Sequence, residues 1–235
     1  MSIFGCGKSP TYKSLRDLSE KRAENASTSS IMEARKSVRI LLIDDQEFSA
    51  LHNLKNNGFN VIRIEGIDRI EEVQDYPVVM VDLQGVGKTL NPTGQGAHLI
   101  QQTKKLYPEK YVIAYTGGAT AALTSLAVEF ADKYTTKDIN VEKWCEYLDA
   151  AVQEVANPVA VWGKFRHRLL NQGVTPIQLA ELEDAYVRGL LENPKALSNS
   201  VATRAIKAGI GVDVRNIIDG LIANVIFTMI AQSSH

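Results

Sequence analysis

Residues 38–45 read VRILLIDD and residues 78–82 read VVMVD, and these two stretches decide the fold of the chain. Both are short apolar runs, rich in β-branched side chains, that end directly in aspartate. Runs of this kind form strands that are buried on both faces of a parallel sheet. They therefore predict such a sheet, with carboxylates just past the ends of its strands.

Strands and helices are expected to alternate along residues 38–156. The expected strands cover 38–43, 60–64, 78–81, 111–115 and 133–135. The expected helices between and after them cover 48–57, 67–74, 97–106, 119–129 and 141–155. This alternation predicts an α/β fold with a doubly wound, five-stranded parallel sheet.

Two further segments flank this domain. Residues 1–37 are expected to be an N-terminal extension or linker, with a polar, helical-looking stretch over 12–26 and a Ser/Thr-rich piece over 27–30. Asn157-Pro158 marks the next boundary, and residues 157–235 are expected to form a small all-α module. Its four expected helices cover 159–171, 176–192, 195–208 and 213–231.

The charge is spread unevenly along the chain. Residues 38–156 carry eleven basic and seventeen acidic side chains, a net charge of −6, whereas the segments before and after carry +3 and +2. A nucleic-acid-binding domain usually shows a concentrated basic face, so DNA is not expected as the main partner. The two cysteines have no metal-binding or disulfide spacing, and the longest apolar stretch, 217–231, is interrupted by polar residues. We expect a cytoplasmic protein that does not span a membrane.

The residues that follow the predicted strands are chemically related. Asp44 and Asp45 follow the first strand, Asp82 follows the third, Thr116 the fourth and Lys137 the fifth. Functional residues of a doubly wound sheet gather at the carboxyl ends of its strands. Three carboxylates, a hydroxyl and an ammonium at one edge suit transfer of a phosphoryl group onto a carboxylate beside Mg²⁺.

With these residues in place, segment 38–155 resembles the receiver domain of two-component response regulators. The family's functional positions match the paired acids Asp44 and Asp45, the phosphoacceptor Asp82, the hydroxyl residue Thr116, the switch aromatic Tyr134 and the lysine Lys137. The resemblance implies a flavodoxin-like strand order. It also implies a sensor histidine kinase or phosphotransfer protein as partner, and no enzymatic activity beyond self-phosphorylation and autodephosphorylation at Asp82.

The resemblance also implies a role for each matched residue. Asp45 and Asp82 would bind Mg²⁺ directly, together with the backbone carbonyl of Gln84, and Asp44 would act mostly through water. Lys137 would pair with the phosphoryl group, and Thr116 would follow that group while Tyr134 turns inward.

The chain departs from the family pattern at two places. Asp138 stands where the family usually has proline after the lysine. The segment after Asp82, residues 83–96, is longer than usual and rich in glycine, so it is expected to clamp, shield or contact a partner.

Three other functions compete with a phosphorylated regulator. The same fold can serve as a binding module that has lost phosphotransfer. A haloacid-dehalogenase-like phosphatase needs a second acid two positions after the nucleophile, where this chain has Gln84. A DNA-binding transcriptional regulator would use residues 198–221, but the would-be recognition helix becomes apolar from Ile217 onward, which base reading does not favour.

The last predicted helix instead favours self-association. Its apolar residues recur at spacings of one, three and four and form a broad stripe: Ile217, Ile218, Leu221, Ile222, Val225, Ile226, Met229 and Ile230. An uncovered stripe of this size usually marks an interface, and two-fold dimers are the commonest outcome. The sequence therefore predicts a homodimer formed through the helical module.

Overall fold

The computed structural model describes residues 13–24, 29–192 and 197–211. Its central element is a five-stranded parallel sheet in the order β2-β1-β3-β4-β5. The strands are β1 (Arg39–Ile43), β2 (Asn60–Ile64), β3 (Val78–Asp82), β4 (Tyr111–Thr116) and β5 (Lys133–Thr136). The predicted sheet and its flavodoxin-like order are confirmed.

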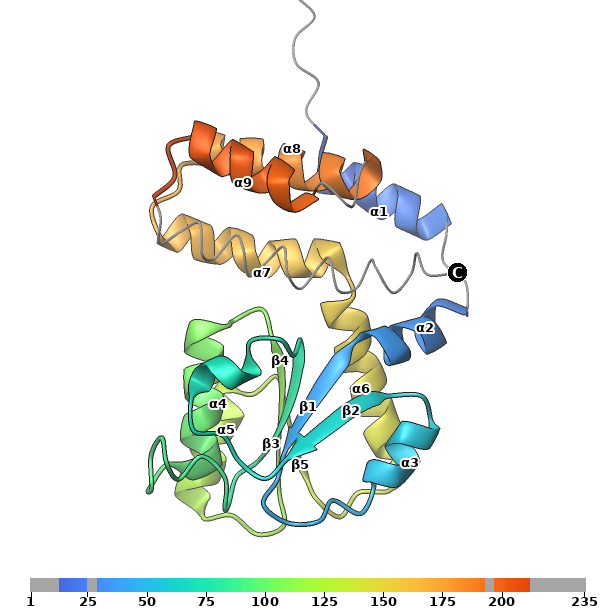
Figure 1. Ribbon diagram of the computed structural model, residues 1–235, viewed down its shortest axis with the longest axis vertical. Helices are drawn as coiled ribbons and strands as arrows, with labels where there is room; N and C mark the ends of the chain where they lie inside the picture. Colours follow the sequence, from blue (N-terminus) through green and yellow to red (C-terminus); the bar gives the residue numbers. More distant parts are fainter. Residues whose placement is uncertain (1–12, 25–28, 193–196, 212–235) are drawn as a thin grey trace, which may run out of the picture.

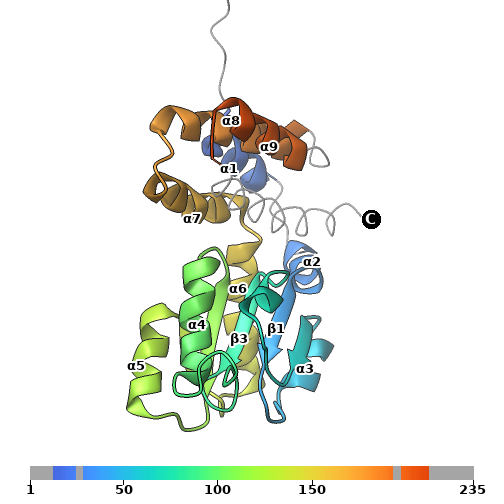
Figure 2. The same ribbon diagram turned by 60° about the vertical axis from the view of Figure 1, so that its left-hand side comes forward.

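Helices cover both faces of the sheet, as Figure 2 shows. One face packs on α3 (Leu51–Asn56) and α6 (Val141–Val155), and the other on α4 (Gln95–Leu106) and α5 (Ala121–Phe130). Because successive strand residues point to opposite faces, Ile40 and Leu42 belong to the first core while Leu41 and Ile43 belong to the second. Strands buried on both sides are therefore apolar where they are buried, as in residues 40–43.

Two expected helices are shorter than the sequence suggests. In place of a helix over 48–57, α3 covers only Leu51–Asn56, and a turn precedes it in which the Leu51 N–H donates to the Phe48 carbonyl at 3.0 Å. In place of a helix over 67–74 there is only the 3₁₀ turn η1 (Ile70–Val73). The Glu72 carboxylate accepts the N–H groups at the start of that turn, and Pro77 follows shortly after it.

The segment before the sheet contains two helices, α1 (Leu15–Glu24) and α2 (Ser29–Ser37). The α2 helix was not expected, because its first residues belong to the Ser/Thr-rich piece. It packs beside α6. There the Arg35 guanidinium binds both Asp149 carboxylate oxygens at 2.7 Å and lies over the Phe59 ring. The N-terminal segment therefore contributes directly to the packing of the α/β domain.

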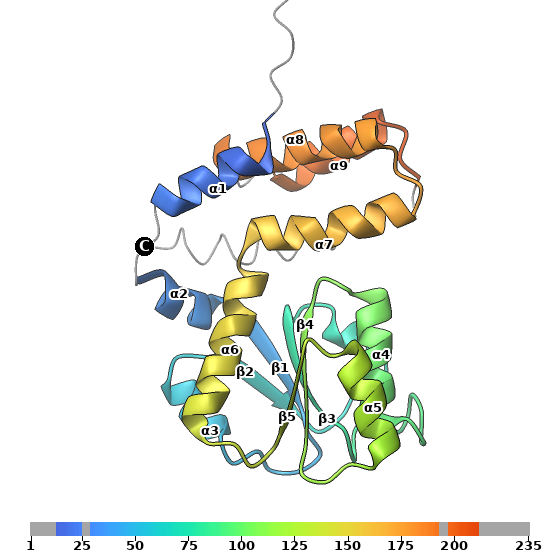
Figure 3. The ribbon, with the colours of Figure 1, turned by 180° about the vertical axis from the view of Figure 1, so that it is seen from behind.

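The helical module consists, in the described residues, of α7 (Pro158–Asn171), α8 (Pro176–Glu192), α9 (Leu197–Lys207) and α1 (Figure 3). Trp162 and Tyr186 stack at its centre with ring centroids 4.9 Å apart, and Leu18 brings α1 into the same core. The division into segments 1–37, 38–156 and 157–235 stays a prediction, to which the structure adds that α1 packs with the module. The predicted helix over 213–231 lies outside the described residues.

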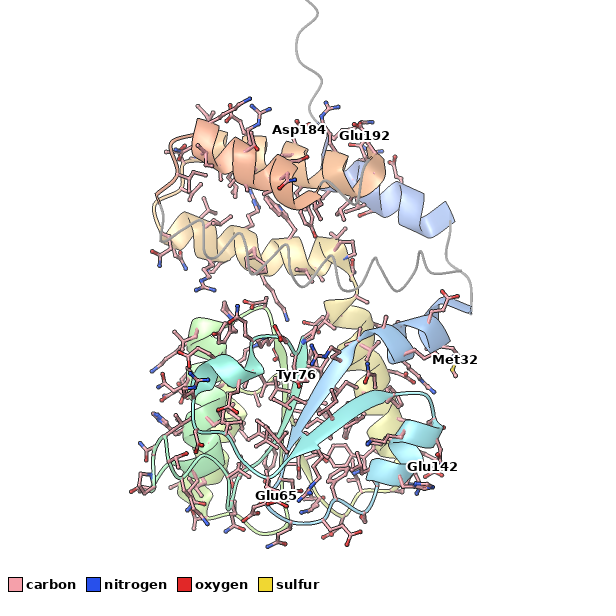
Figure 4. All side chains as sticks on the ribbon, viewed as in Figure 1. Met32, Glu65, Tyr76, Glu142, Asp184 and Glu192 are labelled. Atoms are coloured by element: carbon pink, nitrogen blue, oxygen red, sulfur yellow. The ribbon has the colours of Figure 1, made fainter. Side chains whose placement is uncertain are left out.

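Figure 1 shows the module next to the end of the sheet at which the strands begin. The α6 helix leads into α7 almost directly, since Asn157 caps α7 through its side chain and Pro158 occupies the first helical turn. In Figure 4, Tyr76 marks this amino end of the sheet and Glu65 the opposite, carboxyl end. Among the described helices, none combines the length and apolar content of a membrane span.

Candidate functional site

Three carboxylates meet at the carboxyl end of the sheet. One oxygen from each of Asp44, Asp45 and Asp82 can be chosen so that all lie within 4.8 Å of one another. Asp44 and Asp82 are buried, whereas Asp45 is exposed. The strand register explains the meeting, because Ile43 of β1 pairs with Val81 of β3 and the acids come next along each strand.

Asp44 is held by three partners. The Tyr115 hydroxyl donates to its Oδ2 at 2.8 Å, the Lys137 ammonium lies 2.8 Å from the same oxygen, and the Gln46 N–H donates to Oδ1 at 2.9 Å. Burial and, next, the charge of Asp44 raise the pKa of Tyr115 well above its ordinary value, so the phenol remains a donor. A fully buried carboxylate is thereby satisfied without a metal ion.

Asp82 has weaker support than Asp44. Its Oδ1 accepts the Gln84 N–H at 3.1 Å, and its Oδ2 lies 3.6 Å from the Lys137 ammonium. Burial raises the pKa of Asp82; the Gln84 N–H lowers it, and the nearby Asp44 charge raises it again. The carboxylate that the sequence predicts as nucleophile is therefore the less fully paired of the two buried acids.

Lys137 bridges these two acids from the loop after β5. Its backbone N–H donates to the carbonyl oxygen of Thr116 at 2.9 Å, which ties this loop to the end of β4. One ammonium thus neutralises part of the charge on Asp44 and Asp82 together.

A cavity of about 490 Å³ opens over the acids. Its lining includes Asp45, Asp82, Gln84, Lys88, Gln95 and Lys137. Asp44 lies beneath this surface, since its exposed fraction is 0%. The cavity is therefore polar and bordered by residues from the loops after four strands, β1, β3, β4 and β5.

Neither of the two predicted switch residues lines the cavity, although Thr116 directly precedes the lining residue Gly117. Thr116 is 5% exposed, and its Oγ1 accepts the N–H of Gly118 at 3.0 Å. Tyr134 is half-buried against the core on the α4 and α5 side of the sheet. Their predicted roles in a conformational switch stay predictions.

Two glycines allow the backbone to approach the acids closely. A Cβ atom on Gly96 would lie 1.9 Å from the carbonyl oxygen of Asp82. A Cβ atom on Gly85, whose φ is +83°, would lie 2.0 Å from Oδ2 of Asp45. The start of α4 and the loop before it therefore close directly on the site, as only glycine permits.

This donor set fits Mg²⁺. Hard carboxylate oxygens, few in number and next to a water-accessible cavity, are the ligands that Mg²⁺ uses while keeping part of its hydration shell. Asp45 and Asp82 line the cavity and can offer oxygens to an ion there; Gln84 lines it too, and the role of its backbone carbonyl stays a prediction.

Sequence reasoning assigned no role to three residues that the structure brings to the site. From the sequence, Tyr115 is only a core residue of β4. The sequence does not show that its hydroxyl reaches Asp44, which follows β1. Lys88 lies in the loop after β3 and Gln95 is the first residue of α4, and the only signal in the sequence was the unusual length of segment 83–96.

No protein-family model matches the sequence, and no curated protein matches it. Solved structures do align with it. A CheY-like response regulator receiver domain protein from Methanospirillum hungatei JF-1 is 21% identical, covers 50% of this chain and 94% of its own, and gives a TM-score of 0.43. The beryllofluoride-activated NtrC4 receiver domain dimer is 23% identical, with 49% and 97% coverage and a TM-score of 0.42.

A LuxR-family DNA-binding response regulator from Staphylococcus aureus is 18% identical, covers 49% of this chain and 98% of its own, and gives a TM-score of 0.42. These neighbours are response-regulator proteins, the family that segment 38–155 resembles. They span about half of the chain.

Proposed function

We propose that this chain is a response-regulator-like signalling protein that accepts a phosphoryl group on Asp82, with Mg²⁺ bound beside it. The observation that supports this most strongly is the Lys137 ammonium, which lies 2.8 Å from Asp44 and 3.6 Å from Asp82 at the edge of an open acidic cavity. A cation between two acids offsets charge where a transferring phosphoryl group would add more of it.

The proposed donor is an N-phosphorylated histidine of a sensor kinase or phosphotransfer protein. An oxygen of the Asp82 carboxylate forms a bond to phosphorus while the phosphorus–nitrogen bond breaks. The imidazole leaves with that electron pair, as a neutral base when its other nitrogen carries a proton. Water later attacks the resulting acyl phosphate, which returns the carboxylate and inorganic phosphate.

The residues of the chain divide the work. Asp45, Asp82 and the Gln84 carbonyl would hold the metal ion, which when bound supplies positive charge to the phosphoryl oxygens. Tyr115 orients Asp44, and Asp44 holds the Lys137 ammonium in place. Thr116 and Tyr134 are the proposed switch: the hydroxyl follows the phosphoryl group and the aromatic ring turns inward.

The proposed output is an interaction of the helical module, most simply a homodimer in the cytoplasm. The apolar stripe that motivates it, over 217–230, lies outside the described residues. Light scattering of the full chain at high micromolar concentration, with and without phosphorylation, tests this part. A monomer under both conditions would remove the dimer from the proposal.

Intact mass after incubation with Mg²⁺ and a small phosphodonor such as acetyl phosphate tests the central step. We expect the mass to increase by one phosphoryl group in the wild type and to stay unchanged in Asp82→Asn. Unmodified wild-type protein that still binds Mg²⁺ would instead indicate a binding module without phosphotransfer.

A further inference from the structure

The 83–96 loop forms part of the cavity wall over the three acids. Gln84, Gly85, Lys88 and Gln95 line the same cavity as Asp82 and Lys137. Lys88 and Lys137 therefore face one polar space from two different loops, and they are its only cationic lining residues in the described part of the chain.

The backbone on both sides of Lys88 is anchored. Gly87 is buried at φ +69°, and its carbonyl accepts the N–H groups of Leu90 and Asn91. The Thr89 hydroxyl donates to the Ile67 carbonyl at 2.9 Å. The position of Lys88 in the wall is therefore fixed, and mainly its side chain is free to move.

The loop is also fixed at its ends. Val86 is 1% exposed in the core beneath the loop. Gln95 adopts φ +44°, an unusual value for a residue with a side chain, and its Oε1 accepts the N–H of Gly85 at 2.9 Å. Backbone strain of this kind persists only where the surroundings determine it, and here the hydrogen bond between Gly85 and Gln95 joins the two ends of the segment.

The two cavity lysines differ in their partners. Lys137 is paired with Asp44 and Asp82, whereas among the described residues no carboxylate lies within ion-pair distance of the Lys88 ammonium. An unpaired exposed lysine is ordinary on an open surface. On the wall of an acidic cavity, it is a cation available to an anionic ligand.

Charge balance shows what that ligand gains. Three carboxylates and the Lys137 ammonium leave two negative charges, which one Mg²⁺ neutralises. Replacing the singly charged Asp82 carboxylate by a phosphoryl group of about −2 leaves the site about one charge negative. The Lys88 ammonium supplies the missing positive charge.

We propose that Lys88 is a second phosphoryl-binding residue, whose ammonium contacts oxygens of the phosphoryl group on Asp82 from the 83–96 loop. This rests on the proposed function and names a residue that the receiver resemblance does not supply. Because the loop is already ordered, little backbone entropy is lost when the contact forms.

Calorimetric titration of the full chain with Mg²⁺ and beryllofluoride, a phosphoryl mimic, tests the proposal. We expect Lys88→Gln to weaken beryllofluoride binding about three- to tenfold, as for a partly exposed charge-assisted hydrogen bond. Lys88→Arg should keep most of the affinity. Lys105→Gln, which removes an exposed lysine from the far end of α4, should match the wild type.

Mg²⁺ binding without beryllofluoride should be unchanged or slightly tighter in Lys88→Gln. Equal beryllofluoride affinity in Lys88→Gln and Lys105→Gln overturns the Lys88 proposal alone. A loss of Mg²⁺ affinity in Lys88→Gln also overturns it, because the lysine would then only shape the cavity. Beryllofluoride binding that is absent from the wild type, or that survives in Asp82→Asn, overturns the proposed function itself and the Lys88 proposal with it.

Discussion

The two ends of the sheet both bury charged groups, but in opposite ways. At the carboxyl end, like charges on Asp44 and Asp82 share one ammonium below an open cavity. At the amino end, the Lys110 ammonium is buried and donates to the carbonyls of Gln74 and Tyr76 at 2.7 and 2.9 Å. There, Arg168 of α7 approaches the buried Glu109 carboxylate at 3.9 Å.

The carboxyl end therefore has the features of a ligand-binding site, whereas the amino end packs against the helical module. At the amino end, the charged groups face opposite charges or backbone carbonyls within the protein, although Glu109 Oε2 makes no hydrogen bond in the described residues. At the carboxyl end, Lys137 offsets only part of the like charges, and the cavity there leaves room for a further cation. Changes at the two ends should therefore affect different measurements.

The largest effect is expected where α4 packs on the carboxyl end. Gly96→Ala should lower the free energy of unfolding by about 3–4 kcal/mol, since its Cβ would meet backbone atoms that cannot move aside. Urea unfolding measures the change. Gly163→Ala in α7 is the control: a Cβ there meets nothing within 4 Å, so helix propensity should make it neutral or stabilising. Equal effects of both variants would show that the close approach at Gly96 is not rigid.

The second effect belongs to the amino end and depends on pH. Burial lowers the pKa of Lys110 from 10.5 to about 8, so between these values the unfolded chain binds more protons than the folded one. The free energy of unfolding should therefore rise with pH across that interval, by about 2–3 kcal/mol from this group. Urea unfolding of wild type and Lys110→Met at pH 7.5 and 10 measures it.

The advantage of the wild type over Lys110→Met should grow with pH. The exposed Lys105→Met serves as control and should show no such trend. A constant difference for Lys110→Met would mean that the two carbonyl partners hold the ammonium charged and its pKa near the ordinary value.

The third prediction concerns metal binding at the carboxyl end. Gly85→Ala should weaken Mg²⁺ binding about tenfold, because the new Cβ displaces the Asp45 carboxylate. Gly117 lines the same cavity, yet a Cβ there meets nothing within 4 Å. Gly117→Ala should therefore keep the affinity in a calorimetric titration. Unchanged binding in Gly85→Ala would mean that Asp45 is not a ligand.

The smallest effect is expected at Tyr115. Tyr115→Phe removes one donor from the buried Asp44 and should cost about 1–2 kcal/mol of unfolding free energy. Tyr111→Phe, on the same strand, is the matched control and should cost less, because within the described residues its hydroxyl makes no hydrogen bond. Equal costs would show that Lys137 and the Gln46 N–H suffice for Asp44.

The sequence predicts the sheet and the positions of its acids for a physical reason. Strands buried on both faces must be apolar throughout, so the charged residue that ends each run is conspicuous, and parallel strands bring such residues to one edge. Only the second part of this rule locates Lys137, because β5 reads KYTT and Lys137 is the residue directly after it.

The remaining features depend on contacts that no local pattern encodes. The 83–96 loop has no periodicity, so its anchoring by Thr89 and Gln95 appears only in three dimensions. The place of α1 depends on Leu18 meeting a core formed more than a hundred residues later in the chain. By sequence, Tyr115 is an apolar strand residue; only the structure shows that its hydroxyl donates to Asp44.

The α6 helix runs from the carboxyl end of the sheet to its amino end. It starts at the Asn140 cap, shortly after Lys137, and its Trp144 packs edge-on against Tyr115 with ring centroids 5.5 Å apart. Its fifteen residues span about 22 Å before the chain turns into α7. A tilt of about 5° at the Asn140 end would move the far end by about 2 Å, given that helical rise. Any tilt of α6 at its Asn140 end would therefore be a larger displacement at its α7 end, at the base of the helical module.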